Sequence, residues 1–242
     1  MIKLILCGLW AVCYLVLSIP LLIVLKLMNK KHPQKAARIA FGAVRWIFGM
    51  IVMTAGIRLT VNGKEKIPDG PCLYIANHQS LFDILVTQTQ LPSCTGYVSK
   101  QSNFKVPLLG FWMYRIHCVA LNRESARDGL KAILNCIDEI NAGYNIFIFP
   151  EGTRNKTPEE GLLPFKEGSF KIATKTGCPI VPIAIDGTGR IFRDGFPGIR
   201  LHPEVTVTFC DPVLPSSYSK EEQKHLGATV QEIIAQTLQD RS

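Results

Sequence analysis

The 242-residue sequence predicts an α/β protein: a mixed β-sheet flanked by helices, with a two-helix membrane element at the N-terminus. Residues 1–60 are apolar and basic, short β-like runs alternate with helical stretches from Leu59 onward, and hydrophobic residues make up 47% of the chain, enough for a packed core. We therefore expect membrane-anchoring helices over residues 1–58 and an α/β domain over residues 59–242.

The positive charge of the sequence is confined to the N-terminal part. Of the 27 Lys and Arg residues, eight lie in residues 1–60, which contain no acid, so the remaining 19 equal the 19 acidic residues of the chain. A neutral α/β domain does not predict nucleic-acid binding. An apolar and basic segment indicates a surface of anionic lipid as the partner.

The first apolar segment, Leu4 to Leu25, has 22 residues without a charge and is flanked by Lys3 and Lys26. This length meets the ~20 residues that span a bilayer. It exceeds the apolar core of a signal peptide, and no small-residue cleavage site is evident, so we expect a retained membrane segment. Pro20 predicts a kink or a break near its end.

A second helical segment is expected from about Gln34 to Ile57. Arg38 and Arg45 lie two helical turns apart and share one face, which favours a helix in the membrane interface. Either the two segments form a re-entrant hairpin, or the first spans and the second lies flat. Core helices of a soluble fold are the remaining alternative. The basic residues from Lys26 to Arg45 predict a cytoplasmic membrane location with the active site facing the cytoplasm.

The rest of the chain alternates between strands and helices. The 125–142 helix has the clearest period, with Gly143 placed to end it, and Ser219 and Glu222 form a capping-box pattern. The expected strands are Leu59–Asn62, Cys72–Ala76, Thr95–Ser99, Cys118–Asn122, Asn145–Phe149, Ile180–Ile185 and Val205–Phe209, and the expected helices are 81–91, 104–115, 125–142, 167–176 and 219–239.

The eight cysteines form no C-x-x-C pair and no regular spacing. We therefore expect reduced, mostly buried thiols of a cytosol-facing protein rather than a zinc site or a disulfide framework. No His/Glu pattern has metalloprotease spacing, so no catalytic metal is expected.

The run Leu73-Tyr-Ile-Ala-Asn-His-Gln-Ser-Leu-Phe-Asp83 is the most informative stretch. An apolar strand delivers His78 at its end, and a helix begins shortly after. On one continuous helix His78 and Asp83 would diverge by about 140°. They meet only if His78 sits in the turn before the helix and Asp83 in its first turns. A carboxylate then holds one imidazole nitrogen while the other faces a substrate.

A second motif follows the strand at residues 146–149. Pro150 ends this strand and presents Glu151, Gly152, Thr153 and Arg154 in a loop. Loops at strand ends are the usual place for sites in α/β domains. Glycine allows close backbone approach, threonine offers a hydroxyl, and arginine grips a phosphate through paired donors. A turn with a solvent-facing Glu–Arg pair is the alternative.

The two motifs together resemble those of the glycerolipid acyltransferases, in particular the 1-acyl-sn-glycerol-3-phosphate acyltransferases of bacterial type. Asn-His-Gln-Ser-Leu-Phe-Asp matches the family's N-H-x-x-x-x-D signature, and Phe-Pro-Glu-Gly-Thr-Arg matches its second signature. Lys100, Arg123 and the Pro-containing block 178–182 fit looser blocks. The family usually has an acid before the arginine, where this chain has Asn122. The resemblance covers about residues 62–211.

The resemblance implies an acyltransferase-like α/β fold and transfer of an acyl chain from acyl-CoA or acyl carrier protein to the sn-2 hydroxyl of 1-acylglycerol-3-phosphate, giving phosphatidate. The thioester is a co-substrate, and no cofactor is implied. His78 is then the general base and Asp83 orients it. The implied contacts to the phosphate and glycerol of the acceptor are Lys100, Arg123, Glu151, Gly152, Thr153 and Arg154. Lys166 is a weaker candidate.

Other interpretations remain open. The same chemistry on another lysolipid acceptor, such as a lyso-aminolipid or a different lysophospholipid, is one alternative, and the expected phosphate-binding cations disfavour an acceptor without a phosphate. A non-catalytic membrane adaptor of the same fold is a second alternative, disfavoured by the presence of both motifs. An esterase would need a nucleophile, and Ser80 lies outside any G-x-S-x-G elbow, which favours a helix-capping role for it. The run Asp186-Gly-Thr-Gly189 follows a strand without a clear helix after it, so no nucleotide site is expected there.

Overall fold

The computed structural model describes residues 1–122, 125–193, 198–200 and 202–240. Within these residues seven strands form one sheet in the order β1-β9-β6-β2-β5-β3-β4. The strands are β1 (Arg58–Asn62), β2 (Leu73–Ala76), β3 (Thr95–Lys100), β4 (Val119–Leu121), β5 (Asn145–Ile148), β6 (Ile180–Asp186) and β9 (Glu204–Phe209). Every neighbouring pair is parallel except β6 with β9. The predicted mixed sheet and its strands are confirmed.

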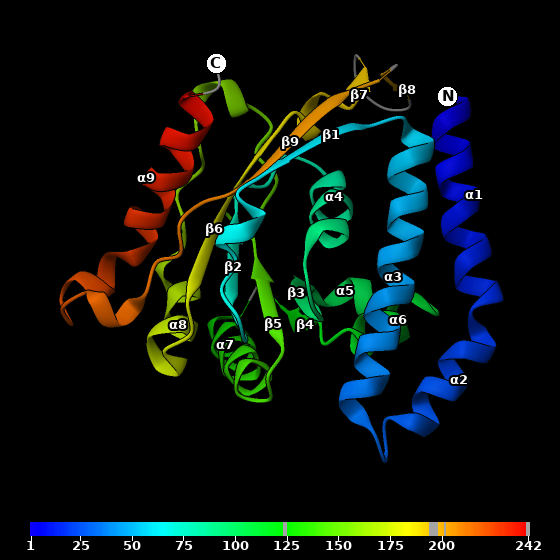
Figure 1. Cartoon of the computed structure of the whole chain (residues 1–242), viewed down its shortest axis with the longest axis horizontal. Helices are drawn as coiled ribbons and strands as arrows, with labels where there is room; N and C mark the ends of the chain where they lie inside the picture. The colour runs from blue at the N-terminus through cyan, green and yellow to red at the C-terminus, as the bar shows by residue number, and fades with distance from the viewer. Residues whose placement is uncertain (123–124, 194–197, 201, 241–242) are drawn as a thin grey trace.

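Helices cover both faces of this sheet, as expected (Figure 1). They are α1 (Ile2–Leu17), α2 (Ile19–Met28), α3 (Pro33–Ala55), α4 (Phe82–Gln90), α5 (Gln101–Phe104), α6 (Leu109–Arg115), α7 (Ala126–Asn141), α8 (Lys171–Thr176) and α9 (Leu226–Gln239). The 3₁₀ turns are η1 (Lys64–Lys66), η2 (Pro158–Glu160), η3 (Glu167–Phe170), η4 (Thr188–Arg190), η5 (Pro215–Ser217) and η6 (Glu222–His225).

The period-2 alternation of the central strands sorts the core into two layers. Tyr74 and Phe147 belong to the hydrophobic cluster that includes α3 and α4, whereas Leu73 and Ile146 belong to the cluster that includes α7, α8 and α9. The strands β2 and β5 are buried throughout. This burial explains why they read as continuous apolar runs in the sequence, since parallel strands covered on both faces have no solvent side.

The first apolar segment is two helices, not one. The chain bends by 51° between α1 and α2, and Pro20 stands in the first turn of α2, which confirms the predicted break. Ser18 at the bend accepts a hydrogen bond from the buried Trp112 indole at 3.0 Å. The bend is therefore tied to α6 of the α/β domain.

The second segment, α3, lies between α1 and the α/β domain (Figure 1). The helix α3 is long and apolar enough to cross a membrane, and so is the bent α1–α2 pair if it is taken as one span. However, 44% of the most apolar stretch of α3 is buried inside the protein. Ala40, Val44, Ile47 and Ile51 of α3 join the same core cluster as Tyr74 and Phe147. The N-terminal helices thus share a core with one face of the sheet.

Some element boundaries differ from those expected. The expected helix 104–115 begins only at Leu109, as α6, and a separate short helix, α5, ends at Phe104, because Pro107 lacks an amide hydrogen and disfavours helical backbone at Val106. Ser219 and Glu222 do form reciprocal contacts, at 2.8 and 3.3 Å, but these close the turn before η6, and α9 begins only at Leu226. A two-stranded hairpin of β7 (Phe192–Arg193) and β8 (Gly198–Ile199) was not expected.

All eight cysteines lie in the described part of the chain and are free thiols, five of them buried. Burial raises the pKa of Cys94, Cys118 and Cys136 to about 12. These thiols therefore stay protonated near neutral pH and are poor nucleophiles, as expected for structural cysteines.

Candidate active site

The two sequence motifs meet at the carboxyl ends of β2 and β5, which are neighbours in the centre of the sheet. His78 follows β2, and Glu151 follows β5. The carboxyl ends of β3 and β6 lie on either side, since all these strands are parallel. This edge of an open parallel sheet is where ligands bind in α/β folds.

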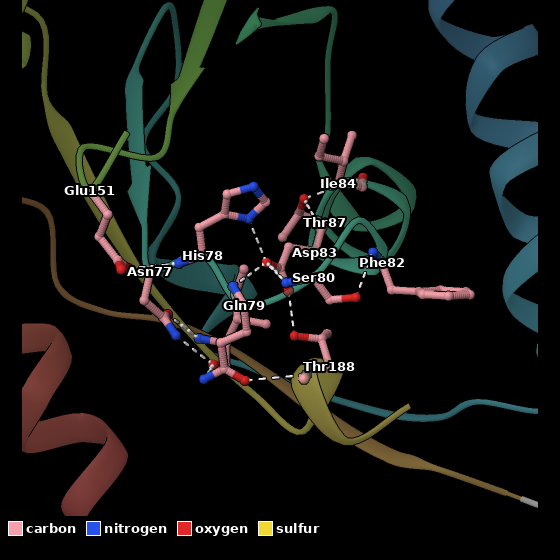
Figure 2. Close-up of polar contacts among 12 residues, drawn as sticks. Asn77, His78, Gln79, Ser80, Phe82, Asp83, Ile84, Thr87, Glu151 and Thr188 are labelled. Atoms are coloured by element: carbon pink, nitrogen blue, oxygen red, sulfur yellow. Dashed lines mark hydrogen bonds and ion pairs between the residues drawn. The ribbon is translucent and has the colours of Figure 1, made fainter. Parts of the chain in front are cut away.

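His78 and Asp83 form a direct pair. The His78 Nδ1 and the Asp83 Oδ2 lie 2.7 Å apart, with His78 in the turn before α4 and Asp83 in its first turn. The expected geometry is thus present. Figure 2 shows the second ring nitrogen pointing away from Asp83. The imidazole ring stacks on Phe149 with a centroid distance of 4.0 Å, which fixes its plane.

The Asp83 carboxylate is fully buried and surrounded by donors (Figure 2). Its Oδ2 also accepts hydrogen bonds from the backbone amides of Gln79 and Ser80, at 2.7 and 2.8 Å. Its Oδ1 accepts one from the Thr188 hydroxyl. Amide and hydroxyl donors stabilise the ionised form of a buried carboxylate, which is the form that supports an imidazolium. The Ser80 hydroxyl accepts from the Phe82 amide at 3.3 Å just before α4, although the N-cap position of this helix is Leu81 rather than Ser80.

The second motif holds the His78 backbone from both sides. The His78 amide donates to Glu151 Oε1 at 2.8 Å, and the His78 carbonyl accepts from the Asn155 amide at 2.7 Å. Asn155 is itself buried, and its side chain donates to the Gly161 carbonyl at 2.6 Å. The loop after β5 therefore fixes the position of the imidazole even though it carries neither member of the pair.

Glu151 departs from its expected place. Sequence reasoning put its carboxylate on the glycerol end of a substrate, but the structure buries it, only 5% exposed, behind the loop and against the His78 amide. The backbone turn after Pro150 directs the side chain inward. Burial raises the pKa of Glu151 to about 7, with a smaller contribution from the nearby Asp83 charge and an opposing one from the His78 amide. Among the described residues its Oε2 has no hydrogen-bond partner.

A cavity of about 550 Å³ opens beside His78. Its polar lining includes His78, Thr153 and four cationic side chains, Lys100, Arg154, Lys156 and Lys166. Within the part of the chain that the structure describes, none of these four cations lies in an ion pair. An unpaired group of cations around one histidine is suited to an anionic ligand.

The backbone of the second motif also contributes to the lining of the cavity. Gly152 lines the cavity with φ +73°, and the Lys166 ammonium lies so close that a Cβ at Gly152 would stand 2.6 Å from it. A side chain at position 152 would therefore displace Lys166 as well as strain the loop. Arg123, the remaining expected phosphate ligand, lies outside the described residues.

The cavity also has an apolar lining, contributed by β4, β5 and the helices α7 and α8. These residues are Leu121, Ala132, Ile133, Cys136, Ile148 and Ile172. A cavity lined by both cationic and apolar side chains matches a ligand that has a charged head and a hydrocarbon part.

Three site residues were missed at the sequence level: Asn155, Lys156 and Thr188. Asn155 and Lys156 directly follow the second motif, so extending that motif by two residues would have included them. Thr188 belongs to the glycine-rich run after β6 that we had considered only as a nucleotide loop. The sequence separates it from Asp83 by 105 positions, and no local signal links the two.

Comparison with known proteins identifies similar chains. The family model described as Acyltransferase matches residues 58–186. A chloroplastic 1-acyl-sn-glycerol-3-phosphate acyltransferase of Brassica napus is 33% identical over 85% of this chain and 61% of its own length. The enzyme of that name from Haemophilus influenzae is 28% identical over 84% of this chain and 82% of its own.

A solved structure is similar over nearly the full chain. The 1-acyl-sn-glycerophosphate acyltransferase PlsC from Thermotoga maritima aligns with a TM-score of 0.82 and 26% identity, covering 99% of this chain and 94% of that one. By contrast, the chain spans 61%, 44% and 41% of the lengths of three plant and algal relatives.

Proposed function

Because the chain belongs to the acyltransferase family, we propose that it transfers an acyl group from a thioester to the sn-2 hydroxyl of 1-acylglycerol-3-phosphate, forming phosphatidate. The observation that carries this proposal is the His78–Asp83 pair, because His78 lines a cavity together with cations that form no ion pair among the described residues. The relatives' names and the similarity to PlsC support the same reaction.

The pair is suited to general-base catalysis without an enzyme nucleophile. His78 removes the proton of the acceptor hydroxyl as its oxygen attacks the thioester carbonyl carbon. Asp83 stabilises the resulting imidazolium through the 2.7 Å contact. The C–S bond then breaks, the imidazolium returns its proton to the leaving thiolate, and the new ester is released. Atoms and protons balance with no other reactant.

The cations that line the cavity are the proposed contacts of the acceptor phosphate. Lys100 ends β3, Arg154 lies in the loop after the neighbouring strand β5, and both line the cavity together with His78. A phosphate of charge −1.5 to −2 requires such partners, and the guanidinium of Arg154 offers a two-point contact. Arg123 remains part of this proposal by resemblance alone. The Gly152 and Thr153 segment would contact the glycerol.

The membrane position of the active site is a further part of the proposal. Helices α1 and α2 expose large apolar side chains, including Ile5, Leu9, Val12, Ile23 and Leu27, on a basic segment. A bent, apolar and basic helix pair is suited to the lipid interface, where both lipid substrates reside. We propose attachment to the cytoplasmic leaflet, with the active site facing the cytoplasm and acyl-CoA or acyl carrier protein as the donor.

An assay with detergent-purified protein tests the reaction. The protein is incubated with 1-acylglycerol-3-phosphate and a long-chain acyl-CoA, and phosphatidate is detected by mass. Product is expected from the wild type and not from His78→Ala. Product formed only with acyl carrier protein donors would identify acyl carrier protein as the donor. Product formed only with another lysophospholipid would identify that lipid as the acceptor in place of 1-acylglycerol-3-phosphate. Failure with every donor and acceptor would favour a non-catalytic adaptor.

A further inference from the structure

The loop after β6 makes direct contact with the catalytic motif. Asn77 exchanges two hydrogen bonds of 2.8 Å with the backbone of Ile185, donating from Nδ2 to its carbonyl and accepting at Oδ1 from its amide. Gln79 accepts from the Gly189 amide at 3.3 Å. The residues before and after His78 in the sequence are therefore both bonded to the segment 185–189 (Figure 2).

Thr188 stands at the centre of this contact. It is fully buried, and its hydroxyl donates to Asp83 Oδ1, the carboxylate oxygen that does not contact His78. The turn that presents it depends on Gly187, whose φ is +89° and where a Cβ would come within 2.2 Å of the Glu204 carbonyl. Only glycine fits at position 187, and the turn that it allows holds the Thr188 hydroxyl against the Asp83 carboxylate.

The two oxygens of Asp83 have different partners, and this asymmetry orients the carboxylate. Oδ2 accepts from His78 and from two backbone amides, while within the described residues Thr188 is the one donor to Oδ1. Without that donor, Oδ1 would be a buried charged oxygen lacking a partner. The carboxylate would then gain by rotating to share the remaining donors, and the contact with the imidazole would weaken.

We propose that Thr188 is a positioning residue for catalysis: its hydroxyl orients the Asp83 carboxylate, and through it the His78 base. The sequence Asp186-Gly-Thr-Gly189 is then a third component of the active site, and its glycines serve the turn rather than a nucleotide. This inference rests on the proposed roles of His78 and Asp83.

Thr188→Val and Thr188→Ser separate the hydroxyl from the shape of the side chain. Valine removes the donor at nearly constant volume, and serine keeps it. In the phosphatidate assay, Thr188→Val should lower kcat about tenfold or more while KM for acceptor and donor stays within about twofold, and Thr188→Ser should keep kcat within about threefold. Thr208→Val is the matched control, because the buried Thr208 hydroxyl has no partner in the described residues and its loss should leave kcat unchanged.

Wild-type kcat in Thr188→Val, or an equal loss in Thr188→Ser, would overturn the proposal, as would an increase in KM that accounts for the loss. Thermal melts accompany each variant. If valine prevents folding, Thr188→Ala replaces it, and failure of both to fold while serine folds would make the hydroxyl structural and also overturn the proposal. If the wild type is inactive, the proposed function is refuted rather than the role of Thr188. If the wild type is active and His78→Ala is inactive, the proposed function stands and the Thr188 variants test the positioning role alone.

Discussion

Glu151→Gln should make the protein more stable at alkaline pH and leave it nearly unchanged at acidic pH. Burial raises the pKa of Glu151 from 4.5 to about 7 in the folded protein. The folded state therefore holds a proton that the unfolded state loses between these values, and wild-type stability falls as pH rises through about 7. Glutamine keeps an oxygen to accept from the His78 amide but carries no charge at any pH.

The size of this effect follows from the two pKa values. The gap between 4.5 and about 7 corresponds to at most about 3 kcal/mol of unfolding free energy, lost by about pH 8. We expect 1–3 kcal/mol, since residual solvation reduces it, or roughly 2–10 °C in Tm for a domain of this size. Tm is measured in detergent from pH 5 to pH 8 for both proteins. Other titrating groups are common to the two, so the difference curve isolates Glu151.

The control for this series is Glu160→Gln, an exposed carboxylate whose replacement should change Tm little at either pH. Parallel curves for wild type and Glu151→Gln would refute the reasoning, because they would mean that the carboxyl is as well solvated in the folded protein as in the unfolded chain. A difference that grows toward acidic pH would contradict the sign.

Two further variants test the ligand contacts. Arg154→Ala should raise KM for the phosphorylated acceptor at least about tenfold and KM for the donor far less, measured by steady-state kinetics with each substrate varied; equal increases would remove Arg154 from the phosphate site. Replacing the exposed Lys30 and Lys31 by glutamate reverses their charge and should weaken binding to phosphatidylserine vesicles about tenfold or more. Binding to neutral vesicles should hardly change, and both are measured by flotation at low salt. Unchanged binding to the anionic vesicles would leave the basic segment without a lipid role.

The contact between His78 and Asp83 was predictable because its geometry is local. His78 and Asp83 lie five residues apart across one strand–turn–helix junction, and the pattern of apolar residues marks both the strand and the helix. The cations Lys100 and Arg154 were also accessible, since Lys100 ends β3 and Arg154 lies in the loop that follows the buried strand β5. Parallel strands bring such positions to one edge of a sheet whatever the strand order.

The orientation of Glu151 and the role of Thr188 were not predictable. A side chain in a loop points inward or outward according to backbone torsions that no periodicity reports. Thr188 reaches Asp83 because β6 pairs with β2, and this strand order results from crossover connections rather than from any local pattern. Similarly, the apolar face of α3 could pack against lipid or against protein. Hydropathy alone does not predict that it joins the protein core on one side of the sheet.

The phosphatidate assay with His78→Ala beside the wild type is the most direct test. General-base catalysis by the His78–Asp83 pair predicts a loss in kcat of about a hundredfold or more in a His78→Ala protein that still folds, because the ring lies at the cavity. Phosphatidate formation at the wild-type rate by a folded His78→Ala protein would contradict the mechanism.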